Sequence, residues 1–105
     1  MKLFLKYTVI VENQNITELQ VQPIYPNPTD NLLFINLSSK SLTTTNVIIY
    51  DAYGRLIYNK VSDIEGNTKL NVDCSTWADG VYYLKVFDKD RDSYHYQRFV
   101  VKREY

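Results

Sequence analysis

Residue types that carry acid–base, nucleophilic or metal chemistry are scarce in this sequence. His95 is the single histidine and Cys74 the single cysteine. A histidine between two tyrosines, with no cysteine or glutamate at ligand spacing, indicates an ordinary strand residue. Cys74 lies in no recognisable nucleophile motif and excludes an intramolecular disulfide, so we expect an inert, partly buried thiol. We therefore expect no catalytic residue, no cofactor and no metal.

Three alternating aspartates offer the strongest metal-like spacing. Asp88, Asp90 and Asp92 have the spacing that opens an EF-hand calcium loop, but such a loop also needs a glycine at its sixth position and a glutamate at its twelfth. Those positions hold Ser93 and Phe99. The pattern therefore favours a solvated hairpin tip over a calcium site.

The composition is that of one folded domain with balanced charge. The chain has 105 residues, of which 45% are hydrophobic, and its 12 basic residues equal its 12 acidic ones. This balance argues against a nucleic-acid partner, because such binders carry a positive excess. No segment approaches the roughly 20 apolar residues of a membrane span, so no membrane insertion is expected. Lys6 interrupts the apolar start, which argues against a signal peptide.

The elements that must position these residues are strands. Apolar residues at every second position predict strands at 2–11, 19–22, 32–37, 47–50, 55–58, 69–72, 81–87 and 94–101. Asp51 should open and Gly54 close a hairpin turn, and prolines make 23–28 a rigid segment that is either extended or turning. Residues 38–46 and 63–67 read as loops. The fold class expected is all-β, an Ig-like antiparallel β-sandwich of about 7–8 short strands.

Tyrosines of the last predicted strand leave two interpretations open. If Phe99 and Val101 point inward, then Tyr94, Tyr96 and Arg98 lie on the outer face. Such a row can stabilise the sheet through cross-strand contacts. It can also stack on sugars or contact a protein partner.

Three segments, in order, resemble signatures of the C-terminal sorting domains of the type IX (Por) secretion system. Residues 25–35 (YPNPTDNLLFI) resemble the YPNPxxxxLxI opening, residues 47–57 (VIIYDAYGRLI) a hairpin motif, and residues 77–86 (WADGVYYLKV) an L-x-x-G-x-Y segment in which Trp77 replaces the usual leucine. The resemblance covers about residues 23–104 and ends, as in the family, on basic residues. The motif positions are Pro26, Asn27, Pro28, Leu32, Ile35, Tyr50, Asp51, Gly54, Gly80 and Tyr82.

The resemblance implies a secretion signal of Bacteroidetes proteins, not an enzyme. It implies an N-terminal cargo in the same chain, transit through the periplasm, and an outer-surface or extracellular destination. The implied partners are the outer-membrane translocon and a sortase-like peptidase. Residues 21–105 would form the sorting domain. Residues 1–20 would be a linker, a strand of the preceding cargo region, or an added first strand of this domain.

The last strands are the expected recognition surface, offering backbone hydrogen bonds and charge. The alternative function is an Ig- or fibronectin-like accessory module that binds carbohydrate or protein on a secreted surface protein. The residues expected to contact the machinery are Val81, Leu84, Val86, Phe99, Val101, Lys102 and Arg103.

Overall fold

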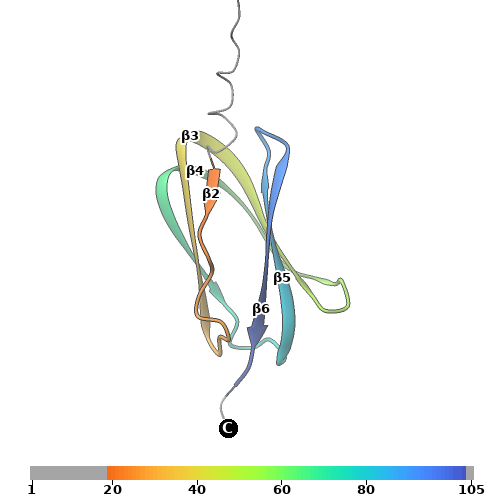
Figure 1. Cartoon of the computed structure of the whole chain (residues 1–105). Coiled ribbons are helices and arrows are strands. Elements are labelled where there is room, and N and C mark those ends of the chain that lie inside the picture. The colour runs from red at the N-terminus through yellow and green to blue at the C-terminus, as the bar shows by residue number, and fades with distance from the viewer. Residues whose placement is uncertain (1–18, 104–105) are drawn as a thin grey trace, which may run out of the picture.

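The described chain is a curled antiparallel sheet, all-β as the sequence predicts. The computed structural model describes residues 19–103. β3 is central: its first half pairs with β2 and β4, and its second half pairs with β4 and β5, which in turn pairs with β6 (Figure 1). The strands are β2 (Leu19–Val21), β3 (Leu32–Asp51), β4 (Leu56–Asp73), β5 (Gly80–Asp88) and β6 (Ser93–Val101).

Two long strands replace four of the predicted short ones. The loops predicted at 38–46 and 63–67 are wrong, because β3 and β4 run through them. Pairing continues past a bulge between Ser39 and Thr43, whose hydroxyl groups bond each other at 2.9 Å. This contact satisfies polar side chains that are buried there. The predicted sandwich of seven or eight strands is therefore replaced by 5 described strands in one sheet. The strand predicted at 2–11 lies outside the described residues.

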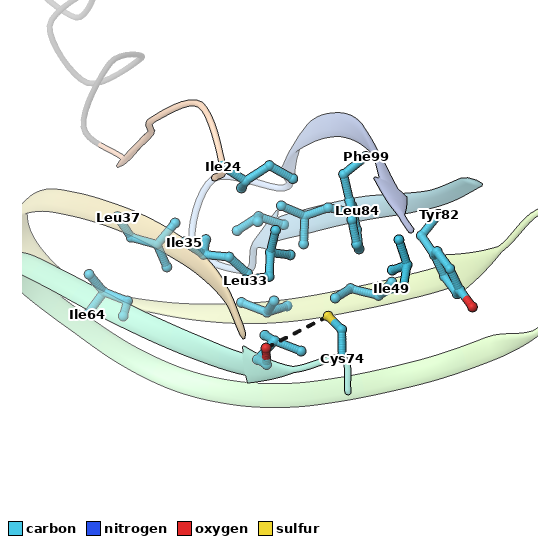
Figure 2. Close-up of a cluster of buried hydrophobic side chains, with 14 of the residues drawn as sticks. Ile24, Leu33, Ile35, Leu37, Ile49, Ile64, Cys74, Tyr82, Leu84 and Phe99 are labelled. Carbon is cyan, nitrogen blue, oxygen red and sulfur yellow. Dashed lines mark hydrogen bonds between the residues drawn. The ribbon is translucent and has the colours of Figure 1, made fainter. Parts of the chain in front are cut away.

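The core lies inside the curl. Every second residue is buried in β5, and in β3 on either side of its bulge, as alternation along a strand requires. Leu33 and Ile35, from the first half of β3, join Ile49, Leu84 and Phe99 from the other half of the sheet in one cluster (Figure 2). The two halves therefore pack against each other across a shared core.

The predicted connections are mostly confirmed. The turn after Asp51 contains Gly54 at φ 84°, in the left-handed region that glycine tolerates. β5 and β6 form the predicted last hairpin. Segment 23–28 bends at residues 26–28 and lies outside any strand except for a bridge at Tyr25. Within residues 19–103 there is no helix of the length and apolar character that a membrane crossing requires.

Candidate functional site

The proline-rich segment 23–28 closes the sheet by bonding to β6. Asn27 Nδ2 donates to the Arg98 carbonyl at 3.4 Å, and Asn27 Oδ1 accepts the Val100 N–H at 2.9 Å. Thr29 follows with two backbone bonds of 2.9 Å, to the Val100 carbonyl and from the Lys102 N–H. Proline has no N–H to donate, so the Asn27 amide takes the place of backbone groups at this edge. The motif asparagine therefore has a structural role.

Gln97 extends this seam toward β2. Its Oε1 accepts the Ile24 N–H and its Nε2 donates to the Gln22 carbonyl, both at 2.9 Å. On the other side of the segment, Tyr25 and Phe34 exchange backbone hydrogen bonds of 3.3 and 2.7 Å. The segment thus joins β3 to β6 (Figure 1). The stretch of β6 near its C-terminal end is therefore covered and is not an open edge.

Asp51 organises the turn between β3 and β4. Its Oδ1 accepts the N–H groups of Tyr53 and Arg55 at 2.9 Å, and its Oδ2 accepts the Arg55 Nε–H at 2.6 Å. Burial raises the pKa of Asp51, but the hydrogen bonds and the charge of Arg55 outweigh it and lower that pKa below its ordinary value. Asp51 therefore acts as an ionised carboxylate that holds the turn.

Tyr82 fills a pocket at the start of β5. Its ring is 5% exposed and lies between Trp77 and Phe99, with centroids 5.2 and 5.7 Å away. Its hydroxyl donates to the Ala78 carbonyl at 2.7 Å. Gly80, two residues earlier, has φ 153°. Trp77, at the family's leucine position, supplies one wall of this pocket.

The two basic residues after β6 have different environments. Arg103 Nη1 donates to Asp79 Oδ1 at 2.9 Å, and its Nη2 donates to the carbonyls of Cys74 and Ser75 at 3.0 and 2.5 Å. The planar guanidinium suits this fork of acceptors. The Lys102 side chain is exposed. Arg103 therefore anchors the chain to the turn after β4, whereas Lys102 faces solvent.

The predicted recognition residues divide between core and surface. Lys102 is exposed, and Val81 is half-buried on the outer face. The others of the two strands lie in the core, each at most 1% exposed, so the folded domain does not present their side chains. These buried residues are Leu84, Val86, Phe99 and Val101.

The remaining motif positions also have distinct surroundings. Ile35 is fully buried in the core, and Leu32 is 36% exposed. The YPNPxxxxLxI pattern over residues 25–35 has its leucine at Leu33, which is fully buried, so the assignment to Leu32 is wrong by one position. Tyr50 is half-buried on the outer face of β3, while Pro26 and Pro28 are exposed. The motif is therefore not a single surface patch.

Cys74 is more deeply buried than the sequence predicts. The side chain is fully buried, and its S–H donates to the Val72 carbonyl at 3.7 Å (Figure 2). Burial, with the nearby Asp73 charge, raises the pKa of the Cys74 thiol to about 11. At neutral pH it is a protonated thiol of low reactivity. His95 is half-buried in β6, opposite Val86.

The aspartate tip is only partly solvated. Asp90 and Asp92 are exposed as predicted, but Asp88 is 1% exposed. Asp88 Oδ1 accepts the N–H groups of Asp90 and Arg91 at 3.0 and 3.1 Å, and the Arg91 guanidinium lies 3.6 Å from its Oδ2. Asp88 thus caps the tip. Across residues 19–103, no group of three or more His, Cys, Asp or Glu side chains is arranged to hold a metal ion.

Sequence reasoning missed two important contacts. Gln97 occupies an inward position of β6, two residues before buried Phe99; a polar residue at a core-facing position is a detectable signal of a specific bond. The anchoring of Arg103 has no such signal. Its carbonyl acceptors lie 28 and 29 residues earlier in the chain.

Comparisons with known proteins agree with this geometry. The sequence profile of the secretion system C-terminal sorting domain matches residues 23–102. A solved structure of PorZ, described as an essential bacterial surface component of the type-IX secretion system of Porphyromonas gingivalis, is similar at 26% identity and a TM-score of 0.57. The likeness covers 79% of this chain but 11% of the PorZ chain. The curated proteins gave no match. The chain belongs to the C-terminal sorting domain family of the type IX secretion system.

Proposed function

We propose that residues 21–105 are a non-catalytic signal that directs an attached N-terminal protein through the type IX secretion system to the outer surface. The family match over residues 23–102 carries this proposal. Transit through the periplasm, reading by the outer-membrane translocon and removal by a sortase-like peptidase belong to the same proposal. Residues 1–20 are then a linker or a strand of the preceding region.

The environment of the ionisable motif residues supports a role without chemistry. Asp51 is engaged by the turn that it organises, and the Tyr82 hydroxyl by the Ala78 carbonyl. Both groups stabilise the fold, and their polar atoms are already engaged in hydrogen bonds. The domain is therefore proposed to be read in its folded form.

A reporter fusion tests the sorting function directly. A fluorescent protein with its own inner-membrane signal, followed by residues 21–105, would be expressed in a bacterium with an active type IX system. We expect the reporter at the cell surface or in the medium. It should stay in the periplasm when the domain is removed or when the translocon gene is deleted. Equal export without the domain would refute the proposal.

Lys102 is the one residue of the expected recognition surface whose side chain is exposed in the described part of the chain. We propose that Lys102 contacts the machinery, while the buried residues of β5 and β6 act by holding that surface in place. Removing residues 99–105 would delete Phe99 and Val101 from the core, so it confounds recognition with unfolding. Lys102→Glu tests the charge alone, with exposed Lys89→Glu as the matched control. Unchanged export of the Lys102 variant would exclude a role for this charge.

A further inference from the structure

The outer face of β5 and β6 carries a cluster of aromatic and basic side chains. The pairs that face each other across the two strands put them on the same side of the sheet, opposite the core. We call this cluster the aromatic face; its members are Tyr83, Lys85, Phe87, Tyr94, Tyr96 and Arg98.

Aromatic rings of this face stand side by side. Phe87 and Tyr94 stack across the strands with centroids 4.6 Å apart, and Tyr94 stacks on Tyr96 at 6.0 Å. Lys85 Nζ lies 4.9 Å from the Tyr94 centroid. The ring planes of each stacked pair are nearly parallel, with interplanar angles of 26° and 22°. Stacking covers part of the Tyr94 ring, while Tyr96 keeps most of its side chain open to a partner.

The tyrosines of the aromatic face are largely exposed to solvent. Tyr96 is 69% exposed, Tyr94 47% and Tyr83 45%. Single exposed apolar residues are ordinary, but a contiguous set marks an interaction surface. The same strands place Tyr82 and Phe99 in the core, so the tyrosines of the aromatic face are not needed to fill it.

The charge of this face selects the class of partner. Its members include two cations, Lys85 and Arg98, and no carboxylate, although the whole chain is neutral. Tyrosine and arginine are the residue types enriched at the centres of protein interfaces. A sugar would stack on open ring surfaces, and the stacking of Tyr94 on Phe87 and Tyr96 reduces the surface of this kind, whereas the two cations suit a protein patch that bears carboxylates.

We propose that the aromatic face docks onto a folded protein whose contact patch bears carboxylates. Because the domain is proposed to be a sorting signal, that protein would belong to the secretion machinery, and this part of the inference rests on the proposed function. Tyr96 would supply buried area and a hydroxyl, and Arg98 a fork for a carboxylate. The face contacts the partner as a surface and needs no added strand.

The test uses the reporter fusion with variants that leave the core intact. Arg98→Glu reverses one charge, and Tyr96→Ala removes the most exposed ring of the face. Tyr53→Ala is the control, since Tyr53 is 86% exposed at the turn after β3 and lies off the aromatic face. At low expression, where export follows binding, we expect about tenfold slower export for each face variant, as for a contact at the centre of an interface. The control should be exported normally.

The outcomes separate this proposal from the sorting function. Normal export of both face variants, with no export of the reporter lacking the domain, overturns the docking face and leaves the sorting function standing. Export of the reporter without the domain overturns the sorting function itself. Saturable binding of a purified surface polysaccharide that Tyr96→Ala abolishes, with export unchanged, assigns the face to a glycan and also overturns docking on a protein.

Folding is measured on the same variants. Urea midpoints equal to the wild type show that an export defect comes from the surface. If Arg98→Glu shifts the midpoint, Arg98→Gln removes the charge without introducing a carboxylate into the face. Slower export of a stable Arg98→Gln variant supports the proposal, and normal export refutes it.

Discussion

Tyr82 and Tyr83 are neighbours in β5 but belong to two regions that differ in what their side chains do. Tyr82 is 5% exposed and bonds to the Ala78 carbonyl, whereas Tyr83 is 45% exposed on the aromatic face. The first belongs to the motif end, by which we mean residues 26–29, 51–55, 74–82 and 102–103. There, Asn27, Tyr82 and Arg103 bond to backbone groups, and Asp51 bonds to the backbone of its own turn. On the aromatic face, side chains contact one another and solvent.

The residues that identify the family are therefore different from the residues that are exposed to a partner. Asn27, Asp51 and Tyr82 are motif residues, and each is engaged in building the fold. Tyr94 and Tyr96 lie outside the quoted motifs and are exposed. Under the proposed function, a loss of export would have two physical origins, unfolding at the motif end and loss of contact at the aromatic face. Stability measurements separate them.

The largest expected effect is at the neighbouring residues Tyr82 and Tyr83. Tyr82→Ala should lower the free energy of unfolding by about 3–5 kcal/mol, because it empties a pocket between two aromatic rings. Tyr83→Ala should cost no more than about 1 kcal/mol, the size of a cross-strand contact. Urea denaturation of both variants measures the difference. Equal losses would erase the distinction between the two regions.

The basic pair after β6 should show the next largest contrast. Arg103→Ala should destabilise the domain by about 1–2 kcal/mol, since it leaves carbonyl acceptors of the turn without their donor. Arg103→Lys should recover little, because an ammonium group cannot reproduce the fork. Lys102→Ala should stay within about 0.5 kcal/mol of the wild type. If the Arg103→Ala variant were as stable as the wild type, Arg103 would not act as a structural anchor.

Removing the Asn27 amide should have a smaller and more local effect. Asn27→Ala should cost about 1 kcal/mol, because both of its bonds are at the surface. Amide hydrogen exchange at Val100 should accelerate, since that N–H loses its acceptor. Asn31→Ala, which truncates another exposed asparagine nearby, is the control. Unchanged exchange at Val100 would show that Asn27 does not hold the edge of β6.

The smallest expected effect is the loss of the stabilising Asp51 charge in acid. The pKa of Asp51 is lowered in the folded state, so its ionised form stabilises the fold above its unfolded value of about 4. That contribution is lost as the pH falls below this value and through the lowered pKa. Asp51→Asn should therefore be less stable than the wild type at pH 7, and the gap should narrow in acid. If the free energies of unfolding of the two proteins changed equally with pH, the ionised Asp51 carboxylate would not stabilise the turn.

Local patterning was sufficient for the all-β class, the last hairpin and the turn at Asp51. Period-two alternation predicts β5 and β6 as strands with two distinct faces, and Asp51 with Gly54 predicts the turn, because each signal lies within a few residues of its effect. The outward placement of Tyr94 and Tyr96 follows from the inward placement of Phe99. The long strands did not follow, because serines and threonines at 38–46 have polar groups that resemble a loop until their partners are known.

The amino-acid sequence by itself determined an all-β domain of the sorting family, with its motif residues and the alternation of its faces. The tertiary structure decided which motif residues are structural, that Arg103 is anchored while Lys102 is exposed, and that Asn27 and Gln97 cover β6. It also gathered the aromatic face from two strands. The reason is distance along the chain: Asn27 bonds Val100 across 73 residues, and no local pattern contains such a contact.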